Sequence, residues 1–198
     1  MRSLVVEVKI IGSALEIEQL DLSEIAKLHV SEMAETLTSI RGEVTASNLY
    51  RRLLNNEGSI VLATENGSVI GVLSYTVNHS KIASMGTIFS KPLSWLQVIS
   101  KKGLGGLVRE LNDAYRVSRK VRSFDNQMLY ITTLFVDSRN QNLGIATRMF
   151  DLAREQSKLM CIPLVVDTRV NNDRAIRFYE RQGMREFART SMSMILKS

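Results

Sequence analysis

Hydrophobic and polar residues alternate in part near the N-terminus, which predicts extended chain over residues 3–11 and 14–20. The spacing then becomes helical. The capping sequence Asp21-Leu22-Ser23-Glu24 predicts a helix that ends at Arg41-Gly42. Its apolar face is expected to contain Ile25, Leu28, His29, Met33 and Leu37. A second, shorter helix is expected over about 46–55.

A hairpin is predicted next, with strands over 59–64 and 69–77 around Asn66-Gly67, a pair typical of tight hairpin turns. Residues 80–127 then interrupt the strand pattern. Within them a short helix is expected from Pro92, and an amphipathic helix over about 104–120. The apolar stripe of the second helix, expected to pack on the domain, is Leu104, Leu107, Val108, Leu111 and Tyr115.

The remaining chain alternates between strand and helix patterns. We expect, in order, a strand over 128–136, a helix over 143–159, a nearly all-apolar strand over 162–170, a helix over 173–182 that Gly183 ends, and an extended tail over 184–196. This order predicts one mixed α/β domain over residues 1–198, with the segment 80–127 as a helical insert.

The composition is that of a globular protein: 198 residues, 44% hydrophobic and 23% charged. One cysteine excludes an internal disulfide, and no apolar run is long enough for a membrane span. Glu7 and Lys9 interrupt the apolar N-terminus, which argues against a signal peptide, so we expect a cytoplasmic protein. The three soft metal ligands, His29, His79 and Cys161, are far apart in sequence, so we expect no structural metal.

Residues 80–127 carry nine basic and three acidic side chains, which accounts for the whole net charge of +6. This basic segment is either a solvated helix face or a surface that attracts an acidic acceptor, a phosphate-rich ligand or a membrane. Nucleic acid is disfavoured as a partner, because only Trp95 and Tyr115 are interleaved as aromatics.

A candidate anion site lies where the strand over 128–136 ends and the next helix begins. The first N–H groups of a helix lack intrahelical partners and lie at the positive end of its dipole. Gly144 and Ala146 are small enough for an anion to approach the backbone there. Taken alone, such a pattern more often indicates close packing.

Two spaced motifs sharpen this interpretation. Gln141-x-x-Gly144-x-Ala146 is followed by Asn172-x-x-Ala175-Ile176-x-Phe178-Tyr179-Glu180-x-x-Gly183-Met184. Together they resemble the GCN5-related N-acetyltransferase (GNAT) superfamily over about 59–196, the insert excluded, with Met184 where Phe is usual. The resemblance implies one mixed central sheet flanked by helices, with the helical insert between the third and fourth core strands.

The resemblance also implies an N-acetyltransferase that moves an acetyl group from acetyl-CoA to a primary amine, without a metal. The backbones of Leu134, Phe135 and Val136 would pair with the pantetheine arm, and a strand N–H near Phe135 could serve the oxyanion. The residues implied at the pyrophosphate are Gln141, Asn142, Leu143, Gly144, Ile145, Ala146 and Thr147. Asn172 would contact coenzyme A, cap the following helix, or do both.

By the same resemblance Tyr179 is the general acid; the alternative is a buried aromatic beside Phe178. The strand over 128–136 lacks the carboxylate base that many members carry. Asp167 lies five residues before Asn172, where ribosomal-protein N-terminal acetyltransferases have a Glu. It is therefore a candidate base, with an ion pair to Arg169 or an insert arginine as an equal alternative and a water chain as a third.

The acceptor is not identified by these residues, and a small-molecule amine or a peptide N-terminus would both fit. A non-catalytic acyl-CoA-binding module of the same fold is the alternative function. A homodimer through the insert or the last strand is compatible with the superfamily. His29, on an apolar helix face, is expected to be packed or to line the substrate site.

Overall fold

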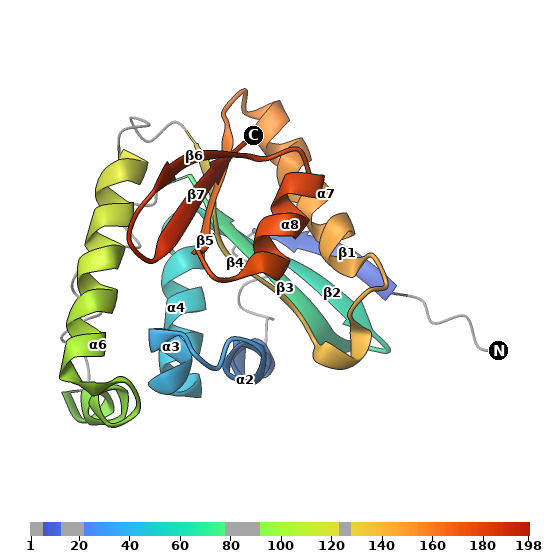
Figure 1. Ribbon diagram of the computed structural model, residues 1–198. Coiled ribbons are helices and arrows are strands. Elements are labelled where there is room, and N and C mark those ends of the chain that lie inside the picture. Colours follow the sequence, from blue (N-terminus) through green and yellow to red (C-terminus); the bar gives the residue numbers. More distant parts are fainter. Residues whose placement is uncertain (1–5, 13–21, 78–91, 123–127) are drawn as a thin grey trace. The chain divides into compact units, whose positions relative to one another are not determined.

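The computed structural model describes residues 6–12, 22–77, 92–122 and 128–198. The predictions over 14–20, at Asp21 and at the two ends of the insert lie outside these ranges. The described elements (Figure 1) are β1 (Val6–Ile11), α2 (Leu22–Glu32), α3 (Leu37–Ile40), α4 (Glu43–Leu54), β2 (Gly58–Glu65), β3 (Ser68–Thr76), α6 (Pro92–Val121), β4 (Leu129–Val136), the 3₁₀ turn η3 (Ser138–Asn140), α7 (Ile145–Leu159), β5 (Leu164–Arg169), α8 (Asp173–Arg181), β6 (Arg185–Arg189) and β7 (Ser193–Lys197).

The strands form one seven-stranded sheet in the order β1-β2-β3-β4-β5-β7-β6. β4 pairs with β5 in parallel, whereas β1–β2, β2–β3, β5–β7 and β6–β7 are antiparallel. The mixed sheet flanked by helices is therefore confirmed. The helical insert is confirmed as well, since α6 lies between β3 and β4 along the chain.

The chain divides into two compact units. Unit 1 contains residues 1–76 and 132–156, and unit 2 contains 77–131 and 157–198. β4 contributes residues to both units: Leu129–Ile131 belong to unit 2 and Thr132–Val136 to unit 1.

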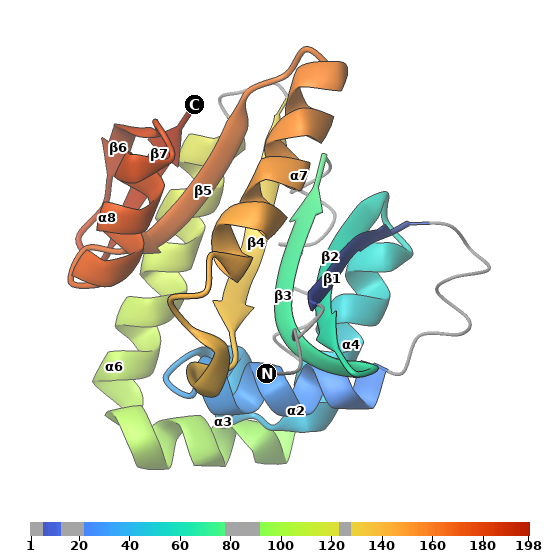
Figure 2. The same ribbon diagram turned by 90° about the vertical axis from the view of Figure 1, so that its right-hand side faces the viewer.

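Unit 1 is built around the β2–β3 hairpin, against which α2 and α4 pack (Figure 2). Asn66 and Gly67 both have positive φ, 51° and 82°, as the predicted tight turn requires. Tyr50, Phe150 and Ile25 are among its fully buried side chains.

The helix predicted to run from Asp21 to Arg41 is wrong as a single element. α2 ends at Glu32, and the separate α3 begins at Leu37. The cause is Thr36, which is extended (ψ 152°) and whose Oγ1 accepts a hydrogen bond from the Ser39 N–H at 3.2 Å. A threonine that caps the following turn starts a new helix instead of continuing the old one.

Unit 2 is built around α6 and the β6–β7 hairpin, which lie side by side (Figure 1). One buried cluster joins them to β4 and β5: Val117, Val121, Met128, Tyr130, Val165 and Ile195, with Ala188 packed against it. Gly183, at φ 81°, follows the last turn of α8 as predicted.

The extended tail predicted over 184–196 consists of two strands. β6 and β7 pair antiparallel, and the chain turns between Arg189 and Ser193. Asp113 of α6 holds this turn, because it accepts hydrogen bonds from the Met192 N–H at 3.2 Å and the Ser193 hydroxyl at 2.7 Å. A tertiary contact thus decides the reversal, and the local sequence pattern did not contain it.

α6 consists of two helical halves that meet at Gly103, whose φ of 70° and ψ of 163° break the helix, as the predicted pair of helices requires. The predicted packing of its apolar stripe holds for Leu107, which is buried, and is wrong for Leu104, Val108 and Tyr115, which are 64%, 58% and 63% exposed. The buried side consists of Leu107 together with Glu110, Asp113, Val117 and Val121. Glu110 and Asp113 can be buried because both have polar partners within unit 2.

Candidate active site

In unit 1 the predicted anion loop leads from the end of β4 into α7. Its backbone turns through two left-handed residues, Asn142 at φ 65° and Gly144 at φ 74°. The Gln141 side chain fixes the loop to the strand, since its Nε2 donates a hydrogen bond to the Val136 carbonyl at 3.1 Å. The glutamine of the motif therefore shapes the loop through its own side chain.

The N-terminal start of α7 has the backbone geometry of an anion site. The first intrahelical bond runs from the Arg148 N–H to the Gly144 carbonyl at 3.0 Å. The N–H groups of Ile145, Ala146 and Thr147 precede this bond and so lack an intrahelical acceptor. A Cβ built on Gly144 would meet no atom within 4 Å, so the loop has room for an anionic group. These features fit an anionic ligand.

Asp137 stabilises the strand end that carries this loop. It is buried, and its carboxylate accepts hydrogen bonds from the Arg139 N–H at 2.9 Å and from the Arg139 side chain at 2.6 and 3.0 Å. These bonds lower the pKa of Asp137 below its ordinary value. The Asp137 N–H also donates to the Ile70 carbonyl of β3 at 2.8 Å, which fixes the position of the strand end.

His29 lies beside the same strand end, packed and buried. Its ring meets the Phe135 ring edge-on, with centroids 5.4 Å apart, and its Nδ1 lies 2.7 Å from the Tyr50 hydroxyl. Burial lowers the pKa of His29 to about 4, so the imidazole is neutral at physiological pH. The structure therefore agrees with a packed histidine.

In unit 2 the parallel pairing of β4 and β5 brings Tyr130 and Asp167 together. Tyr130 is in register with Val165, and Asp167 lies two residues further along β5 on the same face. The Tyr130 side chain spans this offset, and its hydroxyl donates a hydrogen bond to Asp167 Oδ1. Sequence reasoning missed Tyr130, because only the strand register shows that it reaches Asp167.

The surroundings of Asp167 raise the pKa of its carboxyl above the ordinary value. Burial is the largest cause, and the charge of Asp113 adds to it. The Tyr130 hydrogen bond and the positive charge of Arg169 act in the opposite direction. Arg169 itself forms an ion pair with Glu110 of α6, so the hydrogen-bond partner found for Asp167 is a neutral hydroxyl.

Tyr179 lies on α8, buried, with its ring 5.3 Å from that of Phe178. Burial, together with the nearby charge of Asp167, raises the pKa of Tyr179 well above that of a free tyrosine. Its hydroxyl is therefore protonated at neutral pH. Burial raises the pKa of Tyr130 as well, and the charges of Asp167 and Tyr179 add to this effect, so the three side chains influence one another within unit 2.

Asn172 caps α8. Its Oδ1 accepts a hydrogen bond from the Ala175 N–H at 3.1 Å, which is the structural role predicted for it. Asn172 belongs to unit 2 with Asp167 and Tyr179, whereas Leu134–Val136 and Gln141–Thr147 belong to unit 1.

Among the described residues, no group of three or more His, Cys, Asp or Glu side chains is placed to hold a metal ion. Within the same ranges, no helix has the length and apolar character needed to cross a bilayer.

The family model described as "Acetyltransferase (GNAT) family" matches residues 22–184. No curated protein sequence matches this chain.

Solved structures share the fold at low sequence identity. PH1933 from Pyrococcus horikoshii is 12% identical with a TM-score of 0.60, covering 97% of this chain and 98% of its own. The PaiA N-acetyltransferase from Thermoplasma acidophilum, in complex with coenzyme A, is 11% identical with a TM-score of 0.58, covering 97% and 98%. A GNAT family acetyltransferase from Elizabethkingia anophelis, with acetyl-CoA bound, is 11% identical with a TM-score of 0.53, covering 97% and 96%.

Proposed function

Because the chain belongs to the acetyltransferase (GNAT) family, we propose that it transfers the acetyl group of acetyl-CoA to a primary amine, with Asp167 as general base and Tyr179 as general acid. The observation that carries this proposal is the cluster of Tyr130, Asp167 and Tyr179 in unit 2. It combines a carboxylate of raised pKa with a tyrosine that keeps its proton at neutral pH.

The coenzyme is proposed to bind through unit 1. The N–H groups at the start of α7 and the open backbone at Gly144 suit a pyrophosphate. Leu134, Phe135 and Val136 form the end of β4 that leads into this loop, and their backbones are proposed to pair with the extended pantetheine arm. Two structures of similar fold hold coenzyme A or acetyl-CoA, which supports the same ligand here.

The two titratable groups would divide the proton transfers. Asp167 accepts the proton that the attacking amine loses as its nitrogen bonds to the acetyl carbon. Tyr179 donates to the sulfur as the carbon–sulfur bond breaks, so that an amide and a free thiol are formed. A raised pKa suits Asp167 to accepting a proton, because it brings the carboxylate closer to the operating pH.

Tyr130 is proposed as a positioning residue for Asp167. Its hydroxyl donates to Oδ1 and so fixes the orientation of the carboxylate that would accept the amine proton. It also favours the ionised carboxylate, which burial alone would disfavour. An ion pair with Arg169 would make Asp167 a weaker base, but the guanidinium of Arg169 is held by Glu110.

The test is thiol release from acetyl-CoA, measured with primary amines, amino sugars, polyamines and peptides with a free N-terminus. The expected result is release with one of these classes and an acetylated product by mass spectrometry. Asp167→Asn should lower kcat/KM by about 10²–10⁴-fold and leave acetyl-CoA binding intact. If acetyl-CoA binds and no acceptor is acetylated, the chain is the acyl-CoA-binding module instead.

A further inference from the structure

The outward side of α6 carries apolar side chains that the described residues of unit 2 leave exposed. Leu104, Val108, Leu111 and Tyr115 follow one another at spacings of four, three and four residues, which places them on one face of the helix. Leu104, Val108 and Tyr115 are more than half exposed. We call these four residues the outer stripe. Three large apolar side chains left in water on one helix face mark a candidate interaction surface.

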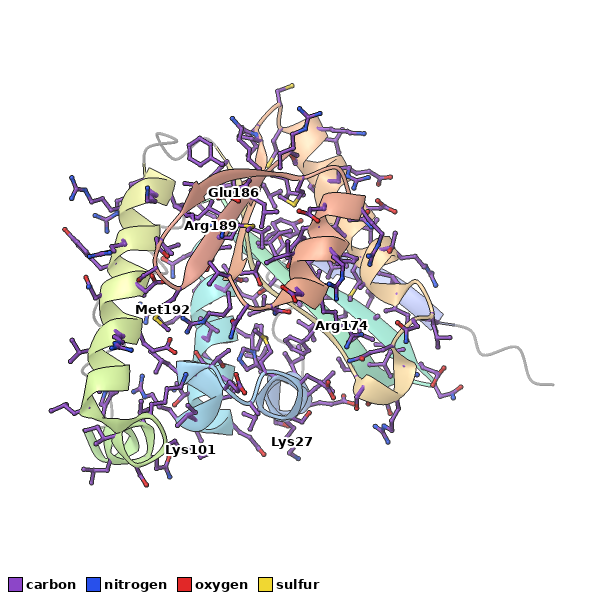
Figure 3. The ribbon with its side chains drawn as sticks, in the orientation of Figure 1. Lys27, Lys101, Arg174, Glu186, Arg189 and Met192 are labelled. Carbon is purple, nitrogen blue, oxygen red and sulfur yellow. The ribbon has the colours of Figure 1, made fainter. Side chains whose placement is uncertain are left out.

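Over the described part of α6 and its C-terminal end, the exposed charges beside the outer stripe are positive. Between Gly103 and the C-terminal end of α6, the exposed basic residues are Arg109, Arg116, Arg119 and Lys120, and the exposed Arg122 directly follows the helix. Lys101 adds to them near the bend of the helix (Figure 3). The two acidic residues of α6, Glu110 and Asp113, both lie on the buried side, where Arg169 and Ser193 respectively bind them.

This division follows from the internal contacts of unit 2. Since Glu110 and Asp113 are held inside, the helix cannot turn its apolar stripe inward without losing the ion pair to Arg169 and the hydrogen bonds to the 190–193 turn. The outer stripe is thus kept outward by the fold. Its Leu, Val and Tyr side chains lie between the buried side of the helix and the side that carries the exposed basic residues.

We propose that the outward face of α6 docks on an anionic lipid surface, with the outer stripe in the interface and the basic residues at the headgroups. Apolar side chains flanked by Lys and Arg are the composition of helices that lie in the plane of a bilayer interface. This inference does not depend on the proposed enzymatic activity. It concerns attachment to the surface of a bilayer. Among the described residues no helix is long and apolar enough to span one.

Charge distinguishes a lipid surface from the other occupants of such a stripe. A second copy of α6 would bring two cationic faces together, which opposes association through this side. A partner helix would need acidic residues beside its own stripe. On α6, Gly105, Asn112 and Arg119 lie beside the outer stripe, where they would face the acidic residues of a partner helix. Of these three only Arg119 is positively charged and could pair with such a residue. An anionic bilayer attracts all the basic residues at once.

The experiment is co-sedimentation of the full chain with vesicles. The probes are phosphatidylcholine alone and an equal mixture of phosphatidylcholine and phosphatidylglycerol, at low and at physiological salt. We expect binding to the anionic vesicles, weakened by salt and absent on phosphatidylcholine alone. Each basic residue near an anionic surface is worth about fivefold in partitioning, so Arg109→Gln/Arg116→Gln/Arg119→Gln should lose about 10²-fold.

A matched variant separates a local surface from net charge. Lys9→Gln/Lys27→Gln/Arg51→Gln removes three exposed positive charges from unit 1, including Lys27 on α2 (Figure 3), and should bind vesicles nearly as wild type does. Leu104→Ser/Val108→Ser/Tyr115→Ser keeps the charges and should lose most of the binding. All of these side chains are exposed, so unchanged circular dichroism is expected.

Three outcomes would overturn the proposal. The first is no preference of the wild type for anionic vesicles. The second is equal loss of binding in the α6 triple-glutamine variant and the unit 1 control, which would make the attraction a property of net charge. The third is a wild-type dimer in sedimentation velocity that the serine variant converts to a monomer, with no vesicle binding, which would assign the stripe to a second copy.

Discussion

The hydroxyl of Tyr130 donates a hydrogen bond to Oδ1 of Asp167 across two adjacent parallel strands. The bond forms because Asp167 lies two residues beyond Val165, the register partner of Tyr130, and so faces the same side of the sheet. It favours the charged form of Asp167 against the effect of burial, which raises the pKa. Activity that depends on ionised Asp167 should therefore depend on Tyr130.

Tyr130→Phe removes the hydrogen bond and leaves the ring that fills the core of unit 2. The pKa of Asp167 should rise further, because the lost bond lowers it in the wild type. The proton is then lost only at higher pH, so the acidic limb of the kcat/KM profile against pH should move to higher pH. A packing role alone would lower activity without moving this limb.

Tyr75→Phe is the control for Tyr130→Phe. Tyr75 is likewise buried, but it lies on β3 in unit 1, and its hydroxyl bonds to Ser59. Loss of this hydroxyl should leave the acidic limb in place. An identical shift in both variants, or none in Tyr130→Phe, would contradict the positioning role.

Tyr179→Phe tests the proposed acid. The change deletes only the hydroxyl, so kcat should fall by about 10²–10⁴-fold, the usual effect of losing a general acid. Acetyl-CoA affinity, measured by calorimetry, and the circular dichroism spectrum should stay the same. Wild-type kcat in this variant would reduce Tyr179 to a buried aromatic of α8.

The elements that were predicted correctly depend on local signals. The Asn66-Gly67 turn and the end of α8 at Gly183 each rest on residues that accept positive φ. The two spaced motifs also indicated the family, because a loop and a helix cap carry their information over a few residues. The start of α7 and the Asn172 cap needed no long-range contact to be recognised.

Apart from the helix that Thr36 divides locally, the failures depend on contacts between residues far apart in sequence. The orientation of α6 is decided by Glu110 with Arg169 and by Asp113 with Ser193, pairs separated by 59 and 80 residues. A hydrophobic stripe predicts the buried face of a helix only where no polar side chain of that helix has a partner in the interior. Glu110 and Asp113 both have such a partner. Tyr130 was missed for the same reason, since its partner Asp167 is 37 residues away.

His29 should make the stability of the protein depend on pH. Burial lowers its pKa to about 4 in the folded state, whereas an unfolded histidine has a pKa near 6.5. Between these two pH values unfolded His29 binds a proton that folded His29 does not bind. The contribution of His29 to the free energy of unfolding is therefore present above the unfolded pKa and is lost as the pH falls. The free energy of unfolding should drop by about 2 kcal/mol from about pH 7 to about pH 5.

Denaturant titrations of the wild type and of His29→Phe at these two pH values check the slope. The variant has no proton to gain at this position, so its free energy of unfolding should change less over the same interval. Most carboxylates have unfolded pKa values near 4, so their contribution falls mainly below this interval. Equal slopes for the two proteins would show that His29 is not the group responsible.

Gly144 allows the coenzyme loop to be tested with a pair of variants that differ only in charge. Its φ of 74° is strained for most side chains, but Asn and Asp tolerate this region, and Asn142 already adopts it in the same loop. A Cβ at Gly144 meets no protein atom within 4 Å, so either variant should fold.

Gly144→Asn adds a neutral side chain where the pyrophosphate is proposed to bind, and Gly144→Asp adds a negative one. Calorimetric affinity for acetyl-CoA should fall in both and fall at least tenfold further in Gly144→Asp, because a carboxylate repels the phosphates and cancels the positive end of α7. The difference should shrink at high salt. Equal affinities in the two variants would mean that no phosphate lies against this helix end.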